Sequence, residues 1–388
     1  MKALKIKDNV YWVGAVDWVM RDSHGYTTEE GSIYNAYLII DEKVVLIDTV
    51  KEAFKEEMIT RISSVIDPKK IDIIISNHGE LDHSGALAEV LKYAPDALIY
   101  SSFPTGPKVL ESLFNEVKLN IKGVKTNDTL NIGKRTLKFV QVPLVHWPDS
   151  MVTYSEYDKI LFSNDAFGQH FATSKLFDYE NDLEVLMHHC KKYYANIVMP
   201  YSKQANRAYE AVKDLKMDMI ATSHGVIWTK HIHDILNLYK DLTTSKAKKE
   251  AVIIYETMYG STEAIGKAIY EAFVNKGIPV RMYDVNNSDF SLLITYVMEA
   301  EYLAIGAPTF NSTILSKMAG FLSYLKGLKP VNKKYIAFGS YGWGGEGVKE
   351  IEGILESIGH EKLSSFREFH KPTKARLLEI TKEVEELL

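Results

Sequence analysis

The sequence predicts an α/β protein with two domains. The chain has 388 residues, more than an ordinary single domain, and 46% of them are hydrophobic, which is enough to fill two cores. From residue 251 onward, short β-branched runs alternate with amphipathic helical stretches, whereas strand patterns crowd the start of the chain. The polar, basic segment TTSKAKKE separates these two regions. We therefore expect one domain over residues 1–247 and a second over residues 248–388.

The charge and composition exclude several classes of protein. The formal net charge is −5, so the chain lacks the excess of positive charge that binding to nucleic acid or an anionic membrane requires. A single cysteine, Cys190, excludes a disulfide framework within the chain and an all-thiolate metal site. The basic start lacks the apolar core and cleavage site of a signal peptide, and no apolar run is long enough to span a bilayer. We therefore expect a soluble, cytoplasmic protein that binds neither nucleic acid nor membrane.

The first domain mixes strand patterns with helices that would cover them. The strand patterns lie at residues 10–16, 32–40, 43–48, 71–76, 97–100, 137–142, 151–154, 160–162, 197–199 and 219–221. The clearest helical patterns lie at residues 52–65 and 85–93. Such a mixture indicates a layered architecture in which helices pack on the outside of sheets.

The second domain is expected to consist of five strand-helix units. The strand patterns lie at residues 251–255, 279–284, 302–306, 335–339 and 362–366. The helical patterns lie at residues 262–276, 290–299, 314–325, 347–358 and 373–388. Parallel strands require crossover connections, so this alternation predicts a doubly wound parallel sheet. The length and the number of units suit a flavodoxin-like domain better than a six-stranded dinucleotide fold.

The strongest functional signal is the motif HGELDH, which directly follows the strand pattern IDIIIS. It supplies two imidazoles and two carboxylates, from His78, Glu80, Asp82 and His83. Three more ligand-type residues follow later strand patterns: His146, Asp165 and His224. Loops at the carboxyl ends of strands can aim side chains at one point, and gathering so many titratable groups without a cation would be unfavourable. Four other histidines lie in helical patterns and are expected to be ordinary core or surface residues: His188, His189, His231 and His233.

This set of side chains could hold two divalent ions, with Asp165 bridging them through its two oxygens. An all-histidine motif would suit zinc, but Glu80 occupies one ligand position here. Histidine and carboxylate ligands with open positions suit redox-active non-haem iron, while zinc and manganese also accept these ligands.

Three loops of the second domain predict a flavin site. The first strand pattern is followed by Thr257, Met258, Tyr259, Gly260, Ser261 and Thr262. Hydroxyls and a glycine before a helix N-terminus form an anion cradle, and the absence of a G-x-G-x-x-G motif and a Walker lysine disfavours dinucleotides and nucleoside triphosphates. The third and fourth strand patterns are followed by Pro308, Thr309, Phe310, Asn311, and by Ser340, Tyr341, Gly342, Trp343, Gly344 and Gly345. Glycines and aromatic residues at these strand ends suit a flat isoalloxazine ring, and the arrangement is similar to the flavodoxin loops that bind FMN.

Together these motifs resemble the flavodiiron proteins, a variant of the metallo-β-lactamase superfamily. The resemblance rests on HGELDH, on the three downstream ligand-type residues, and on the segments LVHWPDSM, SNDAFGQH and SHGVIW, and it covers nearly the whole chain. It implies an N-terminal metallo-β-lactamase-like αββα sandwich and a C-terminal flavodoxin-like domain that binds FMN. Hydrolases of the superfamily carry a histidine at the position of Glu80 and use zinc. Gly79 departs from the family pattern, because relatives commonly carry a larger residue there.

Carried over by position, the resemblance implies two sets of iron ligands. One iron would be held by His78, Glu80 and His146, and the other by Asp82, His83 and His224, with Asp165 bridging them. The resemblance also implies that three further residues supply protons or hydrogen bonds near the irons: His24, His170 and Tyr193.

The implied activity is reduction of O₂ to water, of NO to N₂O, or of both. Reducing O₂ takes four electrons, which two Fe(II) ions and one reduced FMN supply, and reducing two NO takes two. The family implies a head-to-tail homodimer or a homotetramer built from it, and an electron donor such as rubredoxin or reduced coenzyme F420. No CxxC pair occurs, so no fused rubredoxin domain is expected. The alternatives are a zinc-dependent hydrolase of the metallo-β-lactamase type fused to a flavodoxin-like module, and a non-catalytic electron carrier.

Overall fold

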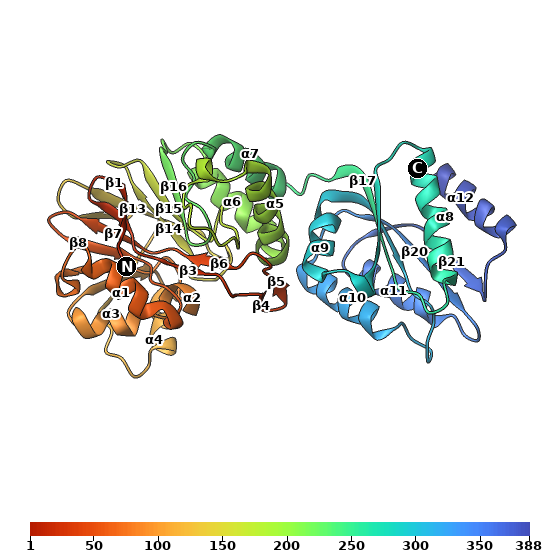
Figure 1. The fold of residues 1–388 in the computed structure, drawn as a ribbon, viewed down its shortest axis with the longest axis horizontal. Helices are drawn as coiled ribbons and strands as arrows, with labels where there is room; N and C mark the ends of the chain where they lie inside the picture. Colours follow the sequence, from red (N-terminus) through yellow and green to blue (C-terminus); the bar gives the residue numbers. More distant parts are fainter. The chain divides into compact units, whose positions relative to one another are not determined.

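The computed structural model describes residues 1–388, which form two compact units (Figure 1). The first unit comprises Met1–His24, Thr28–Tyr193 and Tyr201–Thr244. The second unit comprises Gly25–Thr27, Tyr194–Pro200 and Ser245–Leu388. Two short segments that precede residue 245 therefore belong to the second unit.

The first unit contains two large sheets. The seven-stranded sheet has the spatial order β1 (Leu4–Lys7), β2 (Val10–Trp12), β7 (Tyr37–Ile40), β8 (Val44–Ile47), β9 (Ile73–Ile75), β10 (Leu98–Ser102) and β11 (Ile121–Val124). The five-stranded sheet has the order β12 (Thr129–Asn131), β13 (Thr136–Gln141), β14 (Met151–Ser155), β15 (Ile160–Asn164) and β16 (Met219–Thr222). Strands β3 (Ala15–Asp17) and β6 (Ser32–Tyr34) form an antiparallel pair, and the short strands β4 (Asp22–Ser23) and β5 (Tyr26–Thr27) lie between them in the chain.

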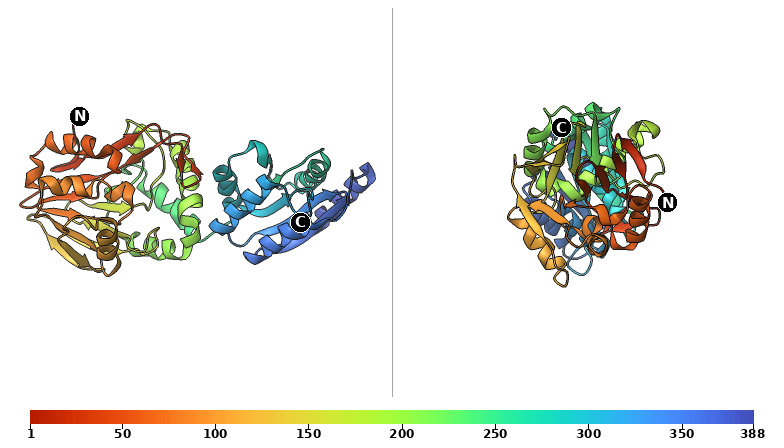
Figure 2. Two further views of the ribbon diagram at one scale, coloured as in Figure 1. Left: turned by 90° about the horizontal axis from the view of Figure 1, so that it is seen from below. Right: turned by 90° about the vertical axis from the view of Figure 1, so that its left-hand side faces the viewer.

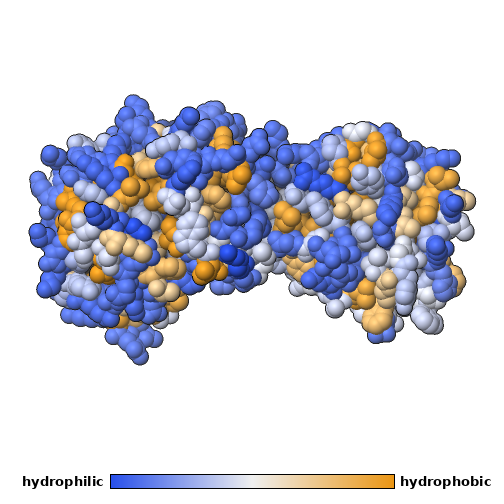
Figure 3. Space-filling model, viewed as in Figure 1, coloured by the Kyte–Doolittle hydropathy of each residue, from blue (hydrophilic) through white to orange (hydrophobic).

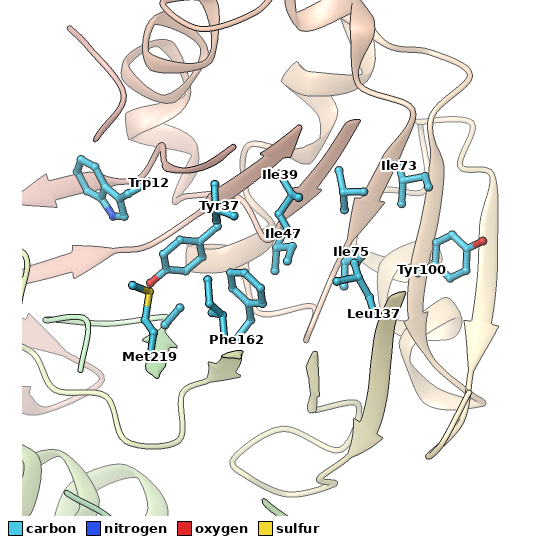
Figure 4. Close-up of a cluster of buried hydrophobic side chains, with 14 of the residues drawn as sticks. Trp12, Tyr37, Ile39, Ile47, Ile73, Ile75, Tyr100, Leu137, Phe162 and Met219 are labelled. Carbon is cyan, nitrogen blue, oxygen red and sulfur yellow. The ribbon is translucent and has the colours of Figure 1, made fainter. Parts of the chain in front are cut away.

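A continuous apolar core fills the space between the two sheets (Figure 4). Ile73 and Ile75 of β9 belong to this core, whereas Ile74 belongs to the core on the outer face of the same sheet. This division follows from the period of two in a strand, where successive side chains point to opposite faces. From the five-stranded sheet, Leu137 and Phe162 enter the same inter-sheet core.

Helices cover the outer faces of both sheets (Figures 1 and 2). The seven-stranded sheet carries α1 (Lys55–Ser63), α3 (Leu87–Tyr93) and α4 (Thr105–Leu113), whose buried apolar residues complete the outer core. The five-stranded sheet carries α5 (Leu183–Tyr193), α6 (Ser202–Val212) and α7 (Ile232–Thr243). The predicted αββα sandwich is therefore confirmed.

The second unit contains five parallel strands. Their spatial order is β18 (Val280–Asp284), β17 (Lys248–Tyr255), β19 (Ala300–Gly306), β20 (Lys334–Tyr341) and β21 (Glu361–Phe369). Helices α8 (Ser261–Asn275) and α12 (Lys374–Leu387) pack on one face. The other face is covered by α9 (Phe290–Glu299), α10 (Ser316–Leu328) and α11 (Glu346–Ser357). Counted along this unit the order is 2-1-3-4-5, the flavodoxin-like arrangement that was predicted.

One predicted strand is wrong. Residues 197–199 lie in helical turns, because α5 continues into a π-helix over Tyr194–Val198 and a 3₁₀ turn over Met199–Tyr201. Val198 and Met199 are buried, and a short buried apolar run has the same composition in a helix as in a strand. The predicted strand 10–16 is divided at Gly14, where a Cβ atom would lie 2.3 Å from the carbonyl oxygen of Tyr34.

The face shown in Figure 3 is mostly hydrophilic, and its hydrophobic residues form small separate groups. None of the helices combines the length and the apolar character that crossing a bilayer would require.

Candidate metal and flavin sites

Four loops of the first unit carry the seven ligand-type side chains. The loop after β9 carries His78 and Glu80, and the short helix α2 (Leu81–Ser84) that follows it carries Asp82 and His83. His146 lies in the loop between β13 and β14, Asp165 directly follows β15, and His224 follows β16. These side chains meet at one edge of the sandwich, although they come from both sheets.

The first cluster contains His78, Glu80, His146 and one oxygen of Asp165. His146 Nε2 lies 3.0 Å from Glu80 Oε2, and His78 Nε2 lies 3.1 Å from Asp165 Oδ2. One ligand atom from each of the four residues lies within 4.8 Å of the others. This spacing lets one cation contact all four.

The second cluster contains Asp82, His83, His224 and the other oxygen of Asp165. His224 Nε2 lies 3.2 Å from Asp82 Oδ2 and 3.0 Å from His83 Nε2. Asp165 Oδ1 lies 3.4 Å from His83 Nε2. The two oxygens of Asp165 therefore face different clusters, which is the geometry of a bridging carboxylate.

Buried polar atoms without partners show that these residues fit a pair of cations. Asp165 is fully buried, and although His78 and His83 lie 3.1 and 3.4 Å from its oxygens, neither oxygen has a partner in hydrogen-bond geometry. Both ring nitrogens of His78 are likewise buried without one. Leaving such groups unsatisfied is costly, and metal ions between the carboxylate and the imidazoles would satisfy them. The mixture of imidazole and carboxylate donors suits non-haem iron and also zinc.

The charges in the clusters hold one another in place. Burial alone would raise the pKa of Glu80, but His146 and His78 lower it to about 2. Burial would also raise the pKa of Asp165, yet His78 and His83 keep it well below its ordinary value. Burial opposes the charged form of His78, but Asp165 and Glu80 raise its pKa well above the ordinary value. Without metal, protons on imidazole therefore compensate the buried carboxylates.

Neighbouring groups orient the ligand loops. The Nδ1 of His224 lies 2.9 Å from the carbonyl oxygen of Ile33, so donation there turns Nε2 toward the clusters. The backbone N–H of Gly79 donates to Asp149 Oδ2 at 2.7 Å. Sequence reasoning missed Asp149, although it lies in the segment LVHWPDSM that carries His146.

An open cavity of about 460 Å³ reaches the clusters at Glu80 and Asp82. His24 and Lys51 line this cavity, together with Trp147. Of the three residues expected to act near the metals, only His24 therefore lies on the open side.

His170 and Tyr193 lie on the buried side, next to His224. The rings of His170 and His224 are 4.5 Å apart, and those of His170 and Tyr193 are 5.0 Å apart. Ser32 Oγ lies 2.8 Å from His170 Nδ1 and 3.3 Å from His224 Nδ1. Burial, and then the nearby His224, keep the pKa of His170 well below its ordinary value, so its ring is neutral.

In the second unit, the three loops expected to bind FMN meet at the carboxyl ends of β17, β19 and β20. The backbone N–H of Thr309 donates to the carbonyl oxygen of Ser340 at 2.9 Å. The hydroxyls of Ser340 and Thr262 lie 3.1 Å apart. Loops 257–262, 308–311 and 340–345 thus form one continuous surface beside the switch point of the sheet.

This surface fits a phosphate and a flat ring. Gly260 adopts φ +80°, and no side chain caps the N-terminus of α8, so its first N–H groups are available to an anion. Tyr259 and Trp343 are 94% and 97% exposed, which is unusual for large aromatic side chains. A flat ring bound beside the cradle would cover exposed aromatic side chains of this kind.

Comparison with known proteins agrees with these sites. Residues 33–225 match the family described as ODP family beta lactamase, and residues 253–383 match the flavodoxin family. Fold and sites thus define a metallo-β-lactamase-like metal domain joined to a flavodoxin domain. The chain is 40% identical to a nitric oxide reductase of Moorella thermoacetica over 359 residues, which are 91% of this chain and 89% of the relative.

Two solved structures superpose on nearly the full chain. The rubredoxin oxygen:oxidoreductase of Desulfovibrio gigas has a TM-score of 0.96 and 37% identity, over 100% of this chain and 98% of the other. The flavodiiron protein of Giardia intestinalis has a TM-score of 0.95 and 33% identity, over 100% and 96%. The chain belongs to the flavodiiron protein family, and its cofactors are FMN and a pair of non-haem irons.

Proposed function

We propose that this protein reduces O₂ to water, NO to N₂O, or both, at the two clusters that share Asp165. The observation that carries the proposal is the division of one buried carboxylate between two sets of imidazole and carboxylate ligands. When bound, the iron pair binds and polarises the gas, and the irons and FMN together supply the electrons. The printed names of the Moorella and Desulfovibrio relatives refer to these two gases.

We propose the following roles for the residues of the first unit. One iron is held by His78, Glu80, His146 and Asp165, and the other by Asp82, His83, His224 and Asp165. Glu80 replaces the histidine typical of zinc hydrolases, which disfavours the hydrolase alternative. His24 faces the open cavity, where it can deliver protons from solvent, while His170 and Tyr193 support the ring of His224 from behind.

We further propose that residues 1–247 carry the metal centre and residues 248–388 the FMN, in a head-to-tail homodimer or a tetramer built from it. In this arrangement the FMN of one subunit serves the irons of the other. Exposed apolar side chains support a mouth that another subunit covers. Leu81 lines the open cavity and is 50% exposed, and Trp18 and Val19, which precede the lining residue Met20 in the chain, are 55% and 81% exposed. The proposed electron donor is a separate rubredoxin or reduced coenzyme F420, and the proposed location is the cytoplasm.

Anaerobic turnover of the protein loaded with Fe(II) and FMN tests the activity. We expect consumption of O₂ or NO with at least one donor, and loss of that consumption in Asp165→Ala while FMN binding is retained. Asp8→Ala is the control, because the Asp8 side chain is 82% exposed. A protein that takes up zinc but not iron, and hydrolyses esters or lactams, would overturn the proposal.

Sedimentation of the loaded protein tests the assembly. Val19→Asp places a charge on the exposed apolar rim and is expected to shift the dimer to monomer and to slow turnover at low protein concentration. Val331→Asp, at a position 44% exposed in the second unit, is the control. Full turnover by a monomer would show that electrons need not cross between subunits.

A further inference from the structure

A second cavity lies between the five-stranded sheet and helices α6 and α7. Val152 of β14 forms part of its wall on the sheet side, and Ala205 and Val212 of α6 form part of the opposite wall. Every residue of the lining is at most 9% exposed. The cavity has a volume of about 10 Å³, measured as the space that the centre of a water molecule can occupy. This is roughly enough for one small guest molecule.

The chemistry of this lining selects an apolar guest. All the lining side chains are Val, Ala, Phe or Tyr, so only two phenol groups carry a polar atom. A buried water needs two to four polar partners, whereas apolar cavities stay dry and bind guests such as xenon or benzene. A polarisable apolar molecule gains dispersion contacts on all sides in such a space.

The cavity adjoins two of the loops that carry the proposed iron ligands. Val145 lines the cavity and immediately precedes His146. Ala166 lines it and immediately follows Asp165. A guest in the cavity would therefore contact Val145 and Ala166. These two residues are the immediate chain neighbours of the proposed iron ligands His146 and Asp165.

We propose that this cavity holds a molecule of the substrate gas, O₂ or NO, next to the loops that carry His146 and Asp165. The proposal rests on the proposed function, since it assigns a waiting position to that reaction's substrate. O₂ and NO are small and nearly apolar, so they partition from water into an apolar space of this size. The open cavity at Glu80 and Asp82, with its ionisable lining, serves protons and water, and the apolar cavity serves the gas.

Xenon binding to the metal-free full-length protein tests the site without any turnover. In crystals pressurised with xenon, we expect one xenon atom among Val145, Ala166 and Ala205. Ala205→Leu fills the space and should abolish that peak. Val212→Thr keeps the shape of the wall but adds a hydroxyl, and it should weaken xenon binding. Val90→Thr is the matched control, because Val90 is fully buried under the other sheet.

Absence of xenon from the wild-type cavity, or an unchanged xenon peak in Ala205→Leu, overturns the proposal. Gas kinetics of the FMN- and iron-loaded protein then test the role. If the cavity holds substrate, Val212→Thr raises KM for the gas and leaves kcat unchanged, while Val90→Thr changes neither. Xenon binding with an unchanged KM also overturns the role. Gas reduction without xenon binding refutes only the holding site, whereas xenon binding in a protein that reduces neither gas refutes the proposed function.

Discussion

Asp48 holds Asn77 by two hydrogen bonds, from the backbone N–H at 2.7 Å and from the side-chain amide at 2.9 Å. Asn77 immediately precedes His78, and its own side-chain oxygen accepts a hydrogen bond from Thr153. Asp48 is fully buried at the end of β8, so this pair ties the loop of the HGELDH motif to the neighbouring strand. We therefore expect the position of the first ligands to depend on a carboxylate whose hydrogen bonds go to Asn77 and not to a ligand.

Asp48→Asn should weaken iron binding by about 10- to 100-fold, the usual effect of losing a group that orients metal ligands. Asn accepts the φ of 55° that Asp48 adopts, so the backbone is preserved while one acceptor becomes a donor facing the Asn77 amide. Competition with a coloured chelator measures the affinity. Asp72→Asn is the control, since Asp72 accepts a backbone hydrogen bond at the opposite end of β9. Equal affinities in both variants would show that Asp48 has no positioning role.

Gly79→Ala should destabilise the metal-free protein by about 1 to 2 kcal/mol, as overpacking does. A Cβ at this position would lie 2.4 Å from Val109 Cγ1 and 3.3 Å from Asp149 Oδ2. Val109 thus occupies the space that a larger residue would need at position 79. Urea unfolding of Gly79→Ala, Val109→Ala and the double variant measures the coupling between the two sites. The expected result is a smaller loss from Gly79→Ala when Val109 is already Ala, and strictly additive losses would contradict this account.

Trp343→Ala should raise the Kd for FMN by about 2- to 10-fold, the equivalent of one lost aromatic stacking contact. The same change is expected for Tyr259→Ala, because both side chains are almost fully exposed beside the cradle. Quenching of FMN fluorescence by the apoprotein measures the affinity. Tyr157→Ala removes an exposed aromatic side chain from the first unit and should leave the Kd unchanged. An unaltered Kd in both loop variants would place the ring elsewhere.

His360 should make the stability of the protein depend on pH. Burial, and then the nearby Lys333, lower the pKa of His360 to about 4 from its ordinary 6.5. Between these values the unfolded chain binds more protons than the folded chain. The stability contributed by the neutral ring is therefore complete above about pH 6.5 and is lost as the pH falls toward 4.

His360→Leu should remove part of this loss, so that unfolding free energy falls less between pH 7 and pH 4.5, by up to about 3 kcal/mol. Urea unfolding of the metal-free protein at both pH values gives the difference. His233→Leu, at an exposed histidine of α7, serves as the control and should follow the wild type. Parallel curves for wild type and His360→Leu would mean that His360 titrates alike in the folded and unfolded chains.

The strand ends explain why so much of the site was predictable. His78, Asp165 and His224 each follow a strand whose apolar run is plain in the sequence, and the carboxyl ends of neighbouring strands share one edge. Asp48 also follows such a strand, so the same rule could have found it. The contact between Ser32 and His170 joins residues from distant segments and leaves no local pattern. Residues 197–199 were assigned wrongly for a related reason, because only tertiary packing distinguishes their helical turns from a buried strand.

The ligands of the metal pair are scattered from His78 to His224, across loops that meet only after both sheets have formed. We therefore expect iron to enter a folded scaffold, where it displaces the proton that His78 holds beside Asp165. We expect the first unit of the iron-free chain to unfold in a cooperative thermal transition, and a gradual, non-cooperative melt of that unit would contradict this order of assembly. In a cell short of iron, the protein would then stay folded without metal, and it could bind iron as soon as iron became available.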